Sequence, residues 1–374
     1  MRLLSPFLTR VAYPVMAKAH YFSRWHCRKS CGPLMVVTYH GVFPEGYEVQ
    51  DPLLDGNLVT RSAFRDQLSL LKSRYHVISP QEFLDFLDKK TTIPSNSVLL
   101  TCDDGLLNVV TDMLPVLKEL ELSCLFFLTG ASTQAVPQML WYEELWMLFQ
   151  LARGKTLAFQ NQAIPVGAIP AGRVERHASW WKLVGELSQY DAAARADFLA
   201  RFAVAAGLPV DWKADYLEHP IRRRRFQLLT RDQVRELVSA GMSVGAHTLT
   251  HPVLSRCPSE GARQEIEMSG CDPVNLWGSP TWAFAYPFGT PECVSPRELM
   301  MAESAGYRCA FVNVGGGVSE VRNWFAIPRV HILADMRLGD FEAHVSGFHW
   351  YLKSRLERIA GRGIEEPFTR AAVA

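Results

Sequence analysis

Two adjacent carboxylates, Asp103 and Asp104, follow directly on the apolar run SVLLTC and precede a glycine. An apolar run of this length is typical of a buried strand. Packing gives no reason to end such a strand with two negative charges, which repel each other more strongly where the dielectric constant is low. We therefore expect that the end of this strand binds a cation or carries out acid–base chemistry.

Two histidines four residues apart, His247 and His251, follow the apolar run MSVGA. Because Pro252 disfavours a helical conformation at His251, we expect a turn or loop after a strand here, not a helix. Two imidazoles and one carboxylate form a three-ligand set for a borderline divalent metal such as Zn²⁺, with a fourth position left for water. The metal would offset the repulsion between the two aspartates, and the second aspartate would be free to take a proton from water.

A hydrolytic site of this kind also needs a group that protonates the leaving group, and two further histidines are candidates. His40 lies in the segment TYHGV, at the end of a predicted strand, and His331 lies in PRVHI. For each of them taken alone, a hydrogen-bonded structural histidine is an equally good interpretation.

The elements that must position these residues alternate between strands and helices. The apolar runs predict buried strands, and they are apolar throughout, as expected where both faces of a sheet are covered. Helical patterns separate them, and the helix predicted at 230–241 opens with a capping box of Thr230 and Gln233. Alternating strands and helices predict an α/β fold with a parallel sheet or barrel.

A helical insertion rich in Trp, Leu and Ala is predicted at about 131–225, where the strand–helix rhythm is interrupted. Its aromatic side chains would suit sugar rings if it covered the active-site end, and a helical pair with its own small core is the alternative. The run Arg222–Arg225 closes the insertion. We expect this run to be a solvated face, with an anion site as the alternative.

Taken together, the motifs resemble those of the polysaccharide deacetylase family, which carries the NodB homology domain and includes carbohydrate esterase family 4. The first motif, usually TFDDG, stands here as TCDDG at 101–105. The second, H-[ST]-x-x-H, stands as HTLTH at 247–251, and the third, a Pro-aromatic-Gly turn, lies within FAYPFG at 284–289. The resemblance covers roughly residues 34–130 and 226–331.

This resemblance implies a distorted (β/α) barrel that hydrolyses the N-acetyl amide of an amino sugar with one divalent metal, for which Zn²⁺ is favoured. Carried over position by position, Asp103 would be the catalytic base. The metal ligands would be Asp104, His247 and His251.

The remaining roles are assigned by the same resemblance. The backbone N–H of Phe288 would point at the developing oxyanion. Some relatives take the general acid from an early Tyr-His segment, which favours His40 over His331. Ala285 stands where many relatives carry an arginine that pairs with the base, so Asp103 needs another partner, and we predict Arg329. The Asp and Trp of the usual fourth motif have no clear match in GYRCAFVNVGG.

The leading expectation is a metal-dependent hydrolase that removes an N-acetyl group from an amino sugar in a polysaccharide, oligosaccharide or glycoconjugate. A hydrolase of a non-sugar linear amide with the same fold and a catalytically silent carbohydrate-binding protein are the alternatives. The chain has 374 residues with 39 basic and 38 acidic side chains. This balance gives no electrostatic reason to expect a nucleic-acid partner.

Residues 1–33 form a basic extension without Asp or Glu. It is either packed on the main domain or an amphipathic segment that makes peripheral contact with an anionic membrane. No clean apolar core of a signal peptide is evident, and the eight cysteines form no CxxC pair, so we expect a cytoplasmic protein, with membrane association as an addition. The deacetylase barrel would span 34–350, interrupted at about 131–225, and 351–374 would be a C-terminal tail.

Overall fold

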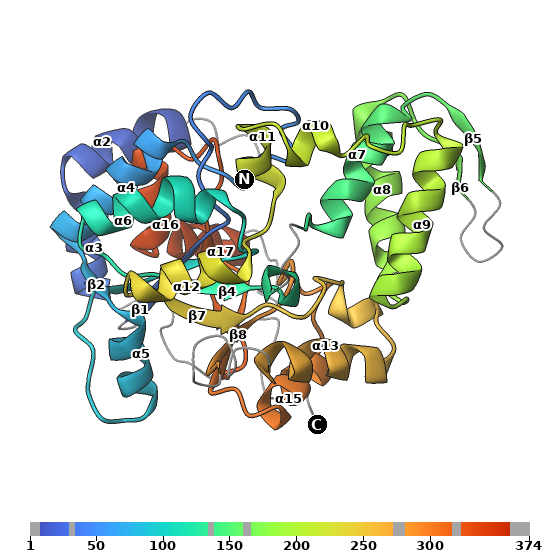
Figure 1. The fold of residues 1–374 in the computed structure, drawn as a ribbon. Coiled ribbons are helices and arrows are strands. Elements are labelled where there is room, and N and C mark those ends of the chain that lie inside the picture. Colours follow the sequence, from blue (N-terminus) through green and yellow to red (C-terminus); the bar gives the residue numbers. More distant parts are fainter. Residues whose placement is uncertain are drawn as a thin grey trace.

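The computed structural model describes residues 8–29, 34–133, 138–159, 166–271, 281–315 and 323–359 (Figure 1). Its central feature is a nearly closed barrel of eight parallel strands, which confirms the predicted fold class. The order around the barrel is β10-β9-β8-β7-β4-β3-β1-β11, and β2 pairs with β3 outside this path. The bounds are β1 Leu34–Tyr39, β2 His76–Ile78, β3 Ser97–Cys102, β4 Leu125–Leu128, β7 Ser243–Ala246, β8 Ala283–Ala285, β9 Cys309–Val312, β10 Ile327–Pro328 and β11 Val330–His331.

One short segment brings the two ends of the barrel together. Strand β10 pairs with β9, strand β11 pairs with β1, and only Arg329 separates β10 from β11. The Arg329 side chain is fully buried, with its guanidinium over the rings of Phe127 and Phe311. The residue that joins the two edges therefore also places a positive charge inside the barrel.

Both faces of the strands are buried, which explains their uninterrupted apolar sequences. On one face, Val36, Leu99 and Phe127 cluster with residues of β8 and β9. On the other face, Val37 and Leu100 belong to the core that also contains the apolar sides of the helices. Successive residues of a strand point to opposite faces, so each face needs its own apolar partner.

Helices follow the strands as predicted, and several begin with a side-chain cap. Capping boxes join Ser79 to Glu82, Thr230 to Gln233 and Ser295 to Glu298. Each box pairs backbone N–H groups that a helix start leaves without partners. The helices around the barrel are α4 Arg61–Arg74, α5 Pro80–Leu87, α6 Leu114–Glu119, α12 Arg231–Ser239, α13 Ser259–Cys271 and α15 Pro296–Ser304.

The insertion is mainly helical and stands at one side of the barrel (Figure 1). Its apolar side chains, among which Phe149 stacks on Phe202 and Trp146 packs against Trp180, form one continuous core with residues of β7, β8 and β9. It also contains a two-stranded antiparallel sheet, formed by β5 and β6. Its elements are α7 Trp141–Leu151, β5 Thr156–Phe159, β6 Val166–Ala168, α8 Arg173–Leu187, α9 Ala192–Ala205, α10 Ala214–Leu217 and α11 Arg222–Phe226.

The N-terminal extension packs on the C-terminal helices. Helices α2 (Tyr13–Lys18) and α3 (Tyr21–Lys29) lie against α16 (Leu338–Val345) and α17 (Phe348–Ile359), where Tyr13, Phe22 and Phe348 form an aromatic cluster. This packing favours the first of the two interpretations of the extension, and contact with a membrane stays a prediction. None of the described helices combines the length and the apolar character that a membrane span requires. Residues 360–374 of the predicted tail lie outside the described residues.

Candidate active site

All the predicted catalytic and metal-binding side chains lie near the carboxyl ends of strands. In a parallel barrel these ends meet at one rim, which brings together residues that are far apart in the sequence. The residues and the strands that they end or follow are His40 after β1, Asp103 and Asp104 after β3, His247 and His251 after β7, Phe288 after β8, and His331 in β11.

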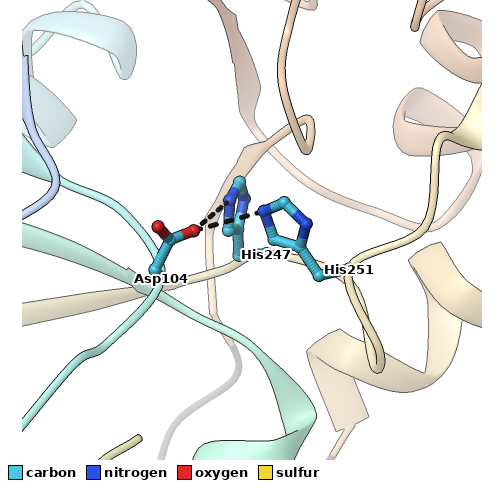
Figure 2. Close-up of side chains that lie close together, drawn as sticks. All are labelled: Asp104, His247 and His251. Atoms are coloured by element: carbon cyan, nitrogen blue, oxygen red, sulfur yellow. Dashed lines mark ion pairs between the residues drawn. The ribbon is translucent and has the colours of Figure 1, made fainter. Parts of the chain in front are cut away.

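Three of these side chains converge on one point. The Oδ1 atom of Asp104 lies 3.5 Å from Nε2 of His247 and 3.2 Å from Nε2 of His251 (Figure 2). One ligand atom from each residue lies within 4.8 Å of the other two, and all three side chains are buried. Two imidazole nitrogens and one carboxylate oxygen in this arrangement match the three-ligand set of an open zinc-type site.

Two further observations support a metal at this point. Nδ1 of His247 lies 2.7 Å from the carbonyl oxygen of Ala285 and must donate its N–H there, so the Nε2 lone pair is left for a ligand. Oδ1 of Asp104 is buried, and no protein group of the described residues donates a hydrogen bond to it. A buried carboxylate oxygen without a donor is costly, and a cation would satisfy it.

The electrostatics agree with an ionised ligand. Burial opposes the charge of Asp104, but the imidazoles of His247, His251 and His40 outweigh it and hold the pKa of this carboxyl well below its usual value. The backbone around the ligands is unusual, since Asp104 and His251 have positive φ angles of 73° and 59°. Such conformations are rare in residues other than glycine and concentrate at functional sites.

The glycine of the TCDDG motif is explained by its surroundings. Gly105 has a φ of +78°, and a Cβ atom there would lie 2.7 Å from a methyl carbon of Leu128 and 3.0 Å from Oγ of Ser132. A side chain would therefore be both strained and crowded. The glycine allows the chain to turn sharply directly after the two aspartates.

The second aspartate has a different partner. Arg329 donates two parallel hydrogen bonds to Asp103, of 2.7 Å to Oδ1 and 2.6 Å to Oδ2, which confirms the predicted pairing. Burial raises the pKa of Asp103, but the charge and hydrogen bonds of Arg329, together with the charges of His247 and His40, outweigh it, so the pKa is lowered. Asp103 is therefore ionised, the state in which a carboxylate can accept a proton.

Both candidate general acids lie beside Asp103. Their rings are 4.7 Å apart, and Nε2 of His40 lies 4.0 Å from Oδ2 of Asp103. Burial, followed by the charge of His40, lowers the pKa of His331 to about 3. His331 is thus neutral near pH 7, and a neutral imidazole is a far weaker acid than the imidazolium ion that acts as a general acid.

Phe288, the predicted oxyanion residue, occupies the turn after β8 with a φ of 61°. Its ring packs against His251 and Tyr142, with ring centroids 4.8 and 5.3 Å away. Among the described residues, no backbone carbonyl accepts a hydrogen bond from the Phe288 N–H. This N–H is therefore available to a ligand beside the three converging side chains.

A cavity of about 370 Å³ opens over these residues, and the insertion supplies much of its lining. The tryptophans of the insertion were predicted to suit sugar rings, but Tyr142 and Glu143 of α7 were not predicted as site residues, because single residues near a helix start give no signal of what they will face. The insertion therefore faces the active site, and its core is continuous with that of the barrel, which differs from the alternative of a helical pair with a small core of its own. The insertion residues in the lining are Tyr142, Glu143, Trp146, His177, Trp180 and Trp181.

The insertion also holds the loop that carries His247 and His251. Nε1 of Trp141 donates a hydrogen bond of 3.2 Å to the carbonyl oxygen of His251. Arg195 of α9 donates a hydrogen bond to Thr250, whose N–H donates to Glu265 at 2.9 Å. Two residues outside the barrel therefore fix the loop that carries His247 and His251.

The prediction that Arg222–Arg225 form a solvated face is wrong for Arg225. This side chain is fully buried and donates hydrogen bonds of 2.8 Å to both Asp55 and Glu143. The four arginines occupy a short helix, α11, so they cannot all point outward, and the inward position finds two carboxylates.

Comparisons with known proteins agree with this geometry. Residues 177–310 match the family model for polysaccharide deacetylase, a segment that includes the second and third motifs. The chain is 26% identical over 119 residues to YxkH of Bacillus subtilis, whose name includes the words polysaccharide deacetylase. The match covers 31% of this chain and only 41% of that relative's length.

Solved structures share the fold. The Streptococcus pyogenes deacetylase PplD, in complex with acetate, has a TM-score of 0.52 at 16% identity and covers 83% of this chain and 97% of its own. IcaB from Ammonifex degensii has a TM-score of 0.51 at 18% identity and covers 84% and 97%. The family model and YxkH confirm the resemblance of this chain to the polysaccharide deacetylase family, and these two solved structures share its fold.

Proposed function

We propose that this protein is a metal-dependent carbohydrate deacetylase that hydrolyses the N-acetyl amide of an amino sugar. The observation that carries the proposal is the convergence of Asp104, His247 and His251 beside a second, arginine-paired carboxylate, Asp103. A structural cluster would need no separate ionised carboxylate next to it. A hydrolase needs both the three metal ligands and the separate carboxylate, because binding the metal and taking the proton are separate tasks.

The roles follow from the positions of the groups. The residues Asp104, His247 and His251 would hold one divalent metal, with Zn²⁺ favoured by the ligand types. Such an ion polarises a carbonyl group and lowers the pKa of water. Asp103 would take the proton of the attacking water as the new C–O bond forms.

Two more groups complete the reaction. The N–H of Phe288 would donate a hydrogen bond to the oxygen that becomes negative in the transition state. His40 would give a proton to the amide nitrogen as the C–N bond breaks, which leaves acetate and a free amine. His331, neutral and next to His40, would then be a neighbour that positions the acid.

Acetate release from N-acetylglucosamine and its oligomers tests the proposal. The holoprotein should release acetate, lose this activity after treatment with a chelator and regain it when Zn²⁺ is added back. Binding of the sugars by the holoprotein without acetate release would favour the silent carbohydrate-binding protein. Neither binding nor release would direct the search to non-sugar amides.

A further inference from the structure

The active-site cavity has two walls that do not belong to the rim of the barrel. The first comes from helices α7 and α8 of the insertion and includes Tyr142, Glu143 and Trp181. The second comes from the loop at 53–58 and includes Leu53 and Leu54. Both walls stand over the strand ends that carry the catalytic residues.

A buried arginine joins the two walls. Nη2 of Arg225 donates a hydrogen bond of 2.9 Å to the carbonyl oxygen of Leu54 and one of 2.8 Å to Oε1 of Glu143. Gln150 of α7 adds a 2.7 Å hydrogen bond to Asp51, just before the same loop. Because Leu54 and Glu143 both line the cavity, the cavity is closed where Arg225 links them.

A closed side restricts which sugars can reach the catalytic groups. An interior unit of a polymer is attached to neighbours on two sides, so its chain must leave the site in two directions. A terminal unit is attached on one side only. The cavity of about 370 Å³ is at the small end of the range of roughly 300–1,000 Å³ found for small-molecule sites.

The insertion wall offers the two kinds of contact that a sugar ring uses. Trp181 is 37% exposed, and its ring lies 5.0 Å from that of Phe288, so an aromatic face is available at the cavity. Oε2 of Glu143 is buried and has no hydrogen-bond partner among the described residues, while Oε1 is held by Arg225. A ligand hydroxyl would satisfy this otherwise costly oxygen.

We infer that the substrate is a single terminal amino sugar, whose ring packs on Trp181 and whose hydroxyl group hydrogen-bonds to Oε2 of Glu143. The inference rests on the proposed deacetylase function and narrows it to chain ends and small glycoconjugates. Residues of the barrel would catalyse the hydrolysis, and residues of the insertion would determine which sugars bind.

The number of acetates released per chain tests this inference. With a hexamer of N-acetylglucosamine, the holoprotein should release one acetate per chain, and mass spectrometry of the product should place the free amine on an end unit. Release of several acetates per chain, or a free amine on an interior unit, would overturn the inference and leave the proposed function intact.

Two variants test the contacts, with the monosaccharide methyl glycoside of N-acetylglucosamine as substrate. Trp181→Ala and Glu143→Gln should each raise KM about tenfold, the loss of one good contact, and leave kcat within a few-fold. Tyr190→Ala is the matched control, because Tyr190 is a similarly exposed aromatic residue of the insertion (39%) outside the cavity lining. Unchanged KM values in both variants, each shown to be folded, would overturn the inference.

If no acetate is released from any of these sugars, the proposed function fails for them. The inference that a terminal sugar contacts Trp181 and Glu143 is then tested by measuring sugar binding. Isothermal titration with the same methyl glycoside should then show binding that both Trp181→Ala and Glu143→Gln weaken about tenfold. Absence of binding by the wild type, or binding by both variants as tight as that of the wild type, would overturn it.

Discussion

Two buried carboxyl groups of this molecule each contact a fully buried arginine, yet their pKa values are shifted in opposite directions. In the barrel, Asp103 holds Arg329, and no other carboxylate of the described residues pairs with that arginine. At the insertion, Glu143 must share Arg225 with Asp55. Arg329 lowers the pKa of Asp103 against the effect of burial. Burial, aided by the charges of Asp104 and Asp55, raises the pKa of Glu143 to about 7 in spite of Arg225.

The difference shows how one kind of group, a buried carboxyl beside an arginine, can serve two tasks. A carboxylate with its own arginine is ionised, as a base that accepts a proton from water must be. A carboxyl group that shares an arginine, here Glu143 with a pKa of about 7, is partly protonated near neutral pH, so it can both accept a hydrogen bond from an uncharged hydroxyl group and donate one to it. Environments that separate the pKa values of neighbouring carboxyl groups are a common way to divide roles in an active site.

The largest expected effect is on the reaction itself. Asp103→Asn removes the base but keeps an oxygen that can accept a hydrogen bond from Arg329, so kcat for acetate release should fall by about 10²–10⁴. The matched neutralisation Glu143→Gln should leave kcat within a few-fold. Steady-state kinetics on N-acetylglucosamine oligomers measure both, and equal losses of kcat would erase the distinction between the two carboxylates.

The second prediction concerns stability. Arg329→Met leaves Asp103 buried without its partner, which should lower the free energy of unfolding by about 3–5 kcal/mol. Urea denaturation at pH 7 followed by circular dichroism measures the change. Arg65→Met is a control, because Arg65 pairs with Glu119 at the surface and should matter by less than about 1 kcal/mol. If Arg329→Met lowers the free energy of unfolding as little as the control does, Asp103 and Arg329 are not a strongly stabilising pair.

The third prediction uses the raised pKa of Glu143. A group whose pKa is higher in the folded state stabilises the fold below its unfolded pKa, here 4.5, and this contribution is lost as the pH rises to about 7. Relative to Glu143→Gln, the wild type should therefore lose about 2–3 kcal/mol of unfolding free energy over this window, at 1.36 kcal/mol per pKa unit. Urea titrations of both proteins at several pH values test this, and a constant difference would show that Glu143 is ionised throughout.

The smallest expected effect tests whether the insertion also supports the metal site. Trp141→Phe removes the hydrogen bond to the carbonyl oxygen of His251, and loss of such an outer contact should weaken metal binding by about 10-fold. Trp212→Phe is the matched control on the insertion, since Trp212 contacts Lys213 and Tyr216 and not the loop that carries His251. Competition with a chromophoric chelator gives both affinities. Equal affinities would assign the metal site to the barrel alone.

The barrel and its site residues could be predicted well from the sequence, because the motifs that define them lie directly next to the strands that position them. TCDDG and HTLTH each end an apolar strand, so the positions of Asp103, Asp104, His247 and His251 follow from strand ends meeting at one rim. Arg329 was predicted as the partner of Asp103 because Ala285 stands where many relatives of the family carry the arginine that pairs with the base. The two-residue strands β10 and β11 that flank Arg329 are too short to show any periodicity.

The insertion half was harder to predict, since its role depends on how helices pack on the barrel. The burial of Arg225 requires Asp55 and Glu143, which are 170 and 82 residues away in sequence. Nothing in a run of four arginines shows which one turns inward. The aromatic composition was visible in the sequence, but which rings face the cavity was decided by tertiary packing.

Metal content tests the central claim most directly. Elemental analysis after reconstitution with Zn²⁺ should find about one ion per chain in the wild type and in Asp103→Asn, and little in His251→Ala, because three protein ligands define the site. Equal loss of metal from the two variants, or a folded wild type that binds no metal, would contradict the division of roles between a metal-binding triad and a separate base.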